Sequence, residues 1–279
     1  MQAESLALRS NNFPDIFYRT KPWSPPLRIY GNTALIMKTL LFLLPALLVP
    51  AGNNTLPADH TDTIYYVSLN RAIQLGQYDG STTTGELKAY GDFGVGSAEK
   101  LSAELVLLDG VAYSIPADGK ATIMPDDTKI PFAAVKFFQA DASITINRPL
   151  KLKKLEAFLD SVIPGNSFAA IRVTGTFSSV KFRSFYEQQR PYKPLKKAGV
   201  AEFERSDVSG TLAGFYTPSS AETLNSPRYH FHFIDTDKNT GGHLLDCRLQ
   251  EVRIDIDYAA GLQVHLPDPA LLEDVDLDK

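Results

Sequence analysis

The stretch Tyr229–Asp246, YHFHFIDTDKNTGGHLLD, decides how we expect this chain to fold and where its chemistry lies. Successive side chains on a β-strand point to opposite faces, so His230 and His232 are predicted to share one face. The phenylalanines that alternate with them then face the other, buried side. The polar, glycine-containing segment that follows predicts a reversal of the chain, after which His243 opens a second strand. Such a return strand brings His243 close to the first two histidines.

The chain has five histidines, and three of them fall in this stretch. Three imidazoles that meet at one point suit zinc or a similar divalent metal, with a coordination position left for water or substrate. The alternative is a set of surface or core histidines on two strands. A cupin-type oxygenase site also begins with His-x-His, but it needs a glutamate a few residues later, where this chain has Phe233, Ile234 and Asp235.

Composition limits the classes of function. The chain of 279 residues is 44% hydrophobic and 22% charged, which is typical of a soluble globular protein. A net charge of −4 offers no basic surplus for nucleic acid, so a small molecule is the expected partner. The single cysteine, Cys247, excludes an internal disulfide and a thiolate metal cluster, and its neighbours indicate a buried position in a strand.

The rest of the chain reads mainly as strands. Asp109-Gly110 lies between two apolar runs and predicts a tight hairpin. Residues 151–163 have apolar side chains at helical spacing and form the best helix candidate. The alternation over residues 168–185 suggests a second hairpin, with its turn near Thr174-Gly175. We therefore predict a strand-dominated α+β fold, with mixed or antiparallel sheets, a few short helices and a three-histidine metal site.

The N-terminal part indicates targeting. From Met37 the chain reads MKTLLFLLPALLVPAG, the layout of a secretory signal peptide over residues 37–51. Its apolar run is shorter than the roughly 20 residues that span a bilayer, although an anchoring or buried helix is the alternative. We expect residues 1–36 to be a non-native or disordered extension and residues 52–62 to be a linker. The mature protein is then secreted or periplasmic, with no membrane contact after cleavage.

Five stretches together carry a resemblance to a known family. They read YDGSTTTGEL, GDFGVGSAEKLSAELVLLDG, PFAAVKFF, VKFRSF and HFHFIDTDKNTGGHLLD. In this order they resemble the α-acetolactate decarboxylases, over roughly Tyr65 to Pro267. The resemblance implies a catalytic domain over residues 63–268, followed by a short C-terminal tail over residues 269–279. It also implies decarboxylation of 2-acetolactate (2-hydroxy-2-methyl-3-oxobutanoate) to acetoin and CO2.

The resemblance implies roles for particular residues. A zinc-like divalent ion is expected on three histidine ligands, His230, His232 and His243. Glu104 of SAELVLLDG matches the family's glutamate, Arg183 of VKFRS matches its substrate-contacting arginine, and Ser97 stands where the family usually has threonine. From the residues alone, Arg183 on a strand edge reads as a solvated surface charge. Alternation leaves open whether Glu104 faces the interior or water.

One feature departs from the family. Its members have a second active-site glutamate in a C-terminal tail, and the tail LPDPALLEDVDLDK offers only Glu273, if it folds back differently. This departure keeps a second hypothesis open, an exported metal- or ligand-binding protein without turnover, beside a third, a cupin-like oxygenase. Edge strands in such a β-rich fold also make a homodimer an expectation.

Overall fold

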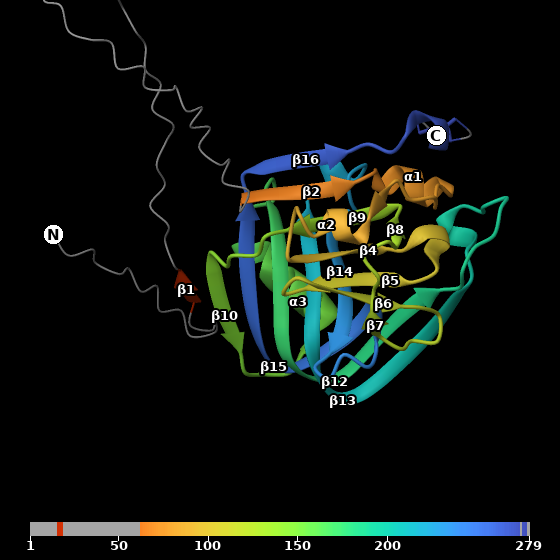
Figure 1. Ribbon diagram of the computed structural model, residues 1–279. Coiled ribbons are helices and arrows are strands. Elements are labelled where there is room, and N and C mark those ends of the chain that lie inside the picture. The colour runs from red at the N-terminus through yellow and green to blue at the C-terminus, as the bar shows by residue number, and fades with distance from the viewer. Residues whose placement is uncertain (1–15, 19–61, 274, 278–279) are drawn as a thin grey trace, which may run out of the picture.

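The computed structural model describes residues 16–18, 62–273 and 275–277, and within these residues strands dominate (Figure 1). Two seven-stranded sheets face each other, and a two-stranded ribbon of β3 (Thr82–Thr83) and β8 (Lys129–Ile130) lies beside them. One sheet is wholly antiparallel, whereas the other contains one parallel pair. The predicted α+β class with mixed and antiparallel sheets is confirmed.

The first sheet carries the histidine hairpin and is built from long antiparallel strands. Its strands, in spatial order, are β1 (Ile16–Tyr18), β10 (Ala142–Ile146), β15 (Gly241–Ala259), β12 (Phe168–Phe185), β13 (Val200–Thr217) and β14 (Arg228–Asp235), with β11 (Leu150–Lys151) also paired to β15. β14 pairs with β13 along its length and with the first residues of β15 at its end. β14 therefore links β13 to β15, and the four strands β12 to β15 form a closed set of pairings near the histidines.

The prediction of a hairpin turn near Thr174-Gly175 was wrong, because residues 168–185 form the single strand β12. Gly175 is instead a point of close approach between strands. A Cβ there would lie 2.1 Å from the carbonyl oxygen of Glu251 in β15, so only glycine fits. Register shifts around Phe177 then bend the strand without ending it.

The second sheet contributes the opposite wall of the molecule. Its strands, in spatial order, are β16 (Gly261–His265), β2 (Thr63–Val67), β9 (Phe132–Lys136), β4 (Phe93–Ser97), β5 (Glu104–Leu108), β6 (Val111–Ile115) and β7 (Thr122–Ile123). β16 runs parallel to β2, and the other neighbours are antiparallel. The predicted hairpin at Asp109-Gly110 joins β5 and β6, and both turn residues have positive φ, 51° and 79°.

Three α-helices occur in the described residues, α1 (Asn70–Leu75), α2 (Thr84–Leu87) and α3 (Leu152–Val162). Short 3₁₀ turns complete the list, η2 (Glu99–Leu101), η3 (Leu195–Lys197), η4 (Ser219–Ala221) and η5 (Pro269–Leu271). α3 matches the helix predicted over residues 151–163. It buries Leu155 and Leu159 against the first sheet, because these residues lie four apart on one helix face.

The core follows the strand alternation. Phe231 and Phe233 of β14 pack in the cluster that α3 covers, whereas Ile234 packs between the two sheets with Val106 and Phe215. Side chains at even positions of β14 therefore point toward the second sheet. Cys247 is buried in the α3-side cluster, as its sequence context predicts.

The predicted signal peptide at residues 37–51 lies outside the described residues, as do residues 52–61 of the predicted linker. Of residues 1–36, only Ile16–Tyr18 is described, as β1 paired with β10. In the part of the chain that the structure describes, none of the helices has the length and apolar character needed to cross a bilayer.

Candidate active site

The histidine hairpin forms as predicted. His232 in β14 is paired directly across from His243 in β15, and His230 lies two residues earlier on the same face of β14. One ligand nitrogen from each ring lies within 4.8 Å of those of the other two. The three rings face the second sheet, so the point where they meet lies between the two sheets.

The turn before His243 needs two glycines. A Cβ on Gly241 would lie 2.3 Å from the carbonyl oxygen of Phe233, and one on Gly242 would lie 2.5 Å from that of Arg183. Gly242 also has a φ of +146°, which side chains rarely tolerate. The Gly-Gly-His sequence thus allows β15 to lie tightly between β14 and β12 just before it presents the third histidine.

The nitrogen atoms are spaced for a metal ion. Nδ1 of His243 lies 3.4 Å from Nε2 of His232. Two nitrogen ligands of a tetrahedral zinc, each at about 2.0–2.1 Å, are about 3.3–3.4 Å apart. The observed separation therefore fits two corners of one tetrahedral site.

Hydrogen bonds orient two of the rings for metal binding. Nδ1 of His232 lies 2.9 Å from the backbone carbonyl oxygen of Leu105, and Nδ1 of His230 lies 2.8 Å from Oδ1 of Asn225. A carbonyl oxygen only accepts, so Nδ1 donates in both rings and Nε2 keeps its lone pair. This is the arrangement that metal-binding histidines use.

Burial keeps the three histidines in the neutral form that ligates metals. It lowers the pKa of His230 to about 4, with a smaller contribution from the Arg183 charge. Burial also holds the pKa values of His232 and His243 well below the usual range, and repulsion from His230 acts in the same direction. Imidazole that is already neutral binds a cation without first losing a proton.

Glu104 points into the same space from β5 of the second sheet. Its side chain is buried, and Oε2 lies 3.6 Å from Nε2 of His232. It shares the inward face of β5 with Val106, so Glu104 faces the interior and not water, which strand alternation alone did not decide. Burial raises the pKa of Glu104 to about 7, and the nearby Arg183 charge opposes that shift. Oε1 has no hydrogen-bond partner among the described residues.

Arg183 also faces the cavity and is not a solvated edge residue. Its strand, β12, is covered on both sides by β13 and β15, and Arg183 is paired with His243. A β-bulge at Phe177 changes which residues of β12 face α3. Phe177 packs in the α3-side cluster, and after the bulge the even-numbered Phe182 does so. The next residue, Arg183, therefore points to the opposite face, toward the cavity. Its guanidinium carbon lies 4.1 Å from the Phe185 ring centre, and Nη1 is buried with no hydrogen-bond partner in the described chain.

Ser97 completes the group from β4, where it is paired with Glu104 across the sheet. Its hydroxyl oxygen is buried and has no hydrogen-bond partner among the residues described. The structure thus brings all six residues singled out in the sequence to one place, although β4, β5, β12, β14 and β15 each supply part of the set.

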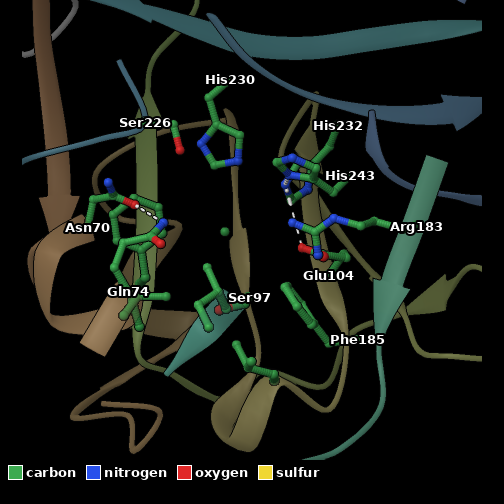
Figure 2. Close-up of a pocket in the computed structure, with 15 residues that line it drawn as sticks. Asn70, Gln74, Ser97, Glu104, Arg183, Phe185, Ser226, His230, His232 and His243 are labelled. Atoms are coloured by element: carbon green, nitrogen blue, oxygen red, sulfur yellow. Dashed lines mark hydrogen bonds and ion pairs between the residues drawn. The ribbon is translucent and has the colours of Figure 1, made fainter. Parts of the chain in front are cut away.

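These residues line a cavity of about 130 Å³. Figure 2 shows Glu104 and Arg183 on one side, and Asn70 and Gln74 of α1 on the other. Apolar side chains fill part of the remaining wall, Ile73, Leu101, Phe132, Phe185 and Leu195. Sequence reasoning missed the α1 pair and Ser226, which also lines the cavity. Asn and Gln on a short helix carry no signal that separates them from surface residues.

The C-terminal tail lies near α1 (Figure 1), where Nε of Arg71 donates to the carbonyl oxygen of Leu277 at 3.4 Å. Glu273 is exposed and does not line the cavity. The described tail residues therefore add no carboxylate to the cavity wall, and Glu104 is the carboxylate that lines it.

Comparison with known proteins agrees with this geometry. A family model described as Alpha-acetolactate decarboxylase matches residues 64–279. The chain is 40% identical to the alpha-acetolactate decarboxylase of Methanosarcina mazei over 210 residues, 74% of this chain and 73% of that protein. It is 35% identical to that of Bacillus subtilis strain 168, over 77% of this chain and 86% of that protein. The crystal structure of alpha-acetolactate decarboxylase from Bacillus subtilis strain 168 superposes with a TM-score of 0.76, at 34% identity, covering 78% and 94%.

Proposed function

This chain belongs to the alpha-acetolactate decarboxylase family, and from that premise we propose how its residues carry out the reaction. As a carboxy-lyase of this family, it converts 2-acetolactate to acetoin and CO2.

The proposed metal ligands are His230, His232 and His243, and zinc is the proposed ion. The fit rests on the 3.4 Å nitrogen separation, the neutral rings and the orientation of two Nδ1 atoms toward acceptors. A divalent ion held there supplies Lewis-acid stabilisation of the negative charge that decarboxylation leaves on the substrate's oxygen atoms.

Arg183 is proposed to bind the substrate carboxylate. A guanidinium presents a planar pair of donors that matches a carboxylate, and buried Nη1 has an unused donor facing the cavity. Stacking on Phe185 holds the group in place. This contact orients the carbon–carbon bond that breaks, and the carboxylate then leaves as CO2.

Glu104 is proposed to deliver the proton that completes acetoin. A carboxyl group with a pKa near 7 is protonated in a substantial fraction of molecules at neutral pH, which suits a general acid. The carbon atom that loses CO2 takes up this proton. The Ser97 hydroxyl, paired across the sheet from Glu104, is proposed to hydrogen-bond to a substrate oxygen.

One observation carries the proposal. Buried polar atoms of Ser97, Glu104 and Arg183 have no hydrogen-bond partners in the described residues, and all three side chains line the cavity at the histidines. Leaving such groups unpaired costs about 1–3 kcal/mol each, so the arrangement indicates a polar ligand of small size. A hydroxy-keto acid satisfies all of them.

The test is acetoin formation from racemic 2-acetolactate by the full chain, with chelator and then with added zinc. We expect zinc-dependent acetoin above the spontaneous rate. Folded, zinc-loaded protein that forms none would reject the assigned roles and leave a metal- or ligand-binding protein. Oxygen uptake with iron would instead favour the cupin-like oxygenase. The metal content of each sample is measured as well, so that a lack of activity is not confused with a lack of metal.

We also propose export through a signal peptide that starts at Met37. The support is the sequence pattern alone, and N-terminal sequencing of the protein recovered from its native host is the test. A mature N-terminus near Gly52 is the expected result, whereas an intact Met1 would contradict it.

A homodimer is a further proposal, based on the edge strands β7 and β16 of the second sheet. Light scattering of the purified chain would separate a dimer from a monomer.

A further inference from the structure

We propose that Asn225 is a positioning residue for the metal centre, because its side-chain oxygen fixes the proton and the orientation of the His230 ring. The inference rests on the proposed metal centre and deepens it. Asn225 lies in the segment between η4 and β14 and is fully buried.

The hydrogen bonds around Asn225 settle which end of its amide faces His230. One atom, Oδ1, lies 2.8 Å from the backbone nitrogen of Ser226 and 2.8 Å from Nδ1 of His230. A backbone N–H only donates, so the atom facing it is the amide oxygen and not the nitrogen. The same oxygen then requires that Nδ1 of His230 carries the hydrogen. Nε2 is left with its lone pair, which is the form that binds a metal.

Asn225 acts on the site through His230. It does not line the cavity, whereas its neighbour Ser226 does. Tyr66 and Thr217 are also fully buried. Burial raises the pKa of the Tyr66 phenol to about 12, and hydrogen bonding by the Thr217 and Asn225 side chains opposes that shift, so the amide lies against the Tyr66 hydroxyl. The amide is therefore held by the core and is out of reach of a substrate.

The other oriented ligand is supported differently. Nδ1 of His232 donates to the backbone carbonyl of Leu105, a group that no side-chain substitution removes. Of these two ring contacts, only the one at His230 depends on a side chain. A side-chain substitution at Asn225 therefore removes a ring acceptor directly, which no substitution at Leu105 does.

Removal of the acceptor has a defined consequence. In Asn225→Leu, the buried Nδ1–H of His230 loses its partner, and the ring gains the alternative state with hydrogen on Nε2, which blocks coordination. Loss of such a contact typically weakens metal binding about 10–100-fold. Asn225→Asp keeps an oxygen acceptor at the same position, so it is expected to retain zinc affinity within a few-fold.

The experiment measures zinc affinity of the full chain by competition with a chromogenic chelator, without substrate. Wild type, Asn225→Leu and Asn225→Asp are compared with Asn147→Leu, which makes the same change at an exposed position between β10 and β11. Weaker binding in Asn225→Leu alone supports the inference. Equal affinity in Asn225→Leu and Asn147→Leu overturns it, as does a loss in Asn225→Asp as large as in Asn225→Leu.

A second measurement does not depend on the folding of a variant. In ¹⁵N-labelled, zinc-free wild type, NMR of the imidazole nitrogens should show hydrogen on Nδ1 of His230. Hydrogen on Nε2 overturns the inference. The proposed reaction fails separately, as zinc-bound protein that forms no acetoin, whereas wild type that binds no zinc overturns the metal centre and this inference together.

Discussion

The buried ion pair between Lys136 and Asp257 offers a sharp test of how the two sheets are held together. Nζ of Lys136 in β9 lies 2.8 Å from Oδ2 of Asp257 in β15, and both side chains are 0% exposed. Oδ2 also accepts from the backbone nitrogen of Gln139 at 2.7 Å. β9 and β15 belong to different sheets, so this pair crosses the interface at which the cavity lies.

The perturbation is Lys136→Met, which removes the cation and keeps a side chain of similar length. Burial raises the pKa of Asp257 to about 6 although Lys136 opposes the shift. Since one pKa unit equals about 1.4 kcal/mol, a rise from 3.8 to about 6 costs the carboxylate roughly 3 kcal/mol even with its partner present. Removing one partner of a buried pair typically costs about 3–5 kcal/mol, and we expect that loss at pH 8.

The cost should depend on pH with a definite sign. The folded-state pKa of Asp257 lies above its unfolded value, so this group's favourable contribution is present below about pH 4 and is lost as pH rises through about 6. In Lys136→Met the Asp257 carboxyl group is protonated at pH 5. At pH 8 it is either an unpaired buried anion or must take up a proton against the pH, and both cost free energy. The destabilisation relative to wild type should therefore shrink at pH 5. Protonation of the histidines affects both proteins equally and cancels.

Urea unfolding at pH 5 and pH 8 measures this difference, and Lys136→Met/Asp257→Leu is the matched control. Apolar replacement of both partners is often neutral or stabilising by about 1–4 kcal/mol, so the double variant should be more stable than the single one at pH 8. A single variant that loses less than about 1 kcal/mol at pH 8, or loses the same amount at both pH values, would refute the reasoning.

Further predictions concern the site and its support. Glu104→Gln should lower kcat by about 10²–10⁴-fold while zinc content stays unchanged, and a smaller loss in a steady-state assay would argue against a general acid. His243→Ala should abolish stoichiometric zinc binding in a metal analysis, and retained stoichiometry would remove it from the ligand set. The metal-free protein should lose stability relative to metal-free His230→Gln as pH falls from about 6.5 toward 4, because the pKa of His230 is lowered to about 4. The raised pKa values of Glu104 and Asp257 act in both proteins and cancel, and a difference that stays flat over that range in urea titrations would contradict the neutral, buried ring. Phe233→Ala should cost about 3–5 kcal/mol in the same assay because the ring is fully buried, and a cost below 1 kcal/mol would mean that the core collapses around the gap.

Local patterns in the sequence predicted more than long-range ones. The shared face of His230 and His232 follows from alternation within one strand, and α3 follows from helical spacing, so both were confirmed. The face of Glu104 depends on which side of β5 another sheet covers, and no local pattern contains that information. The direction of the Arg183 side chain depends on a bulge six residues earlier, which reverses the alternation of faces expected for a regular strand.

The long strands show a second limit. Gly175 resembles a turn residue in the sequence, yet it sits within β12 because another backbone passes close to it. Asn225 gave no signal either, since its role comes from one side-chain oxygen in an irregular segment. Contacts between distant segments decide both positions.

Two consecutive residues of β5 each contribute to the site. Its first residue supplies the Glu104 carboxyl group, and the next supplies the Leu105 carbonyl that orients His232. A one-residue slip of this strand would turn Glu104 to the far face and move the carbonyl away from the ring in the same event. The proposed proton donor and the proposed metal site therefore depend on the same register, and an engineer who wishes to alter one must leave the register of β5 untouched.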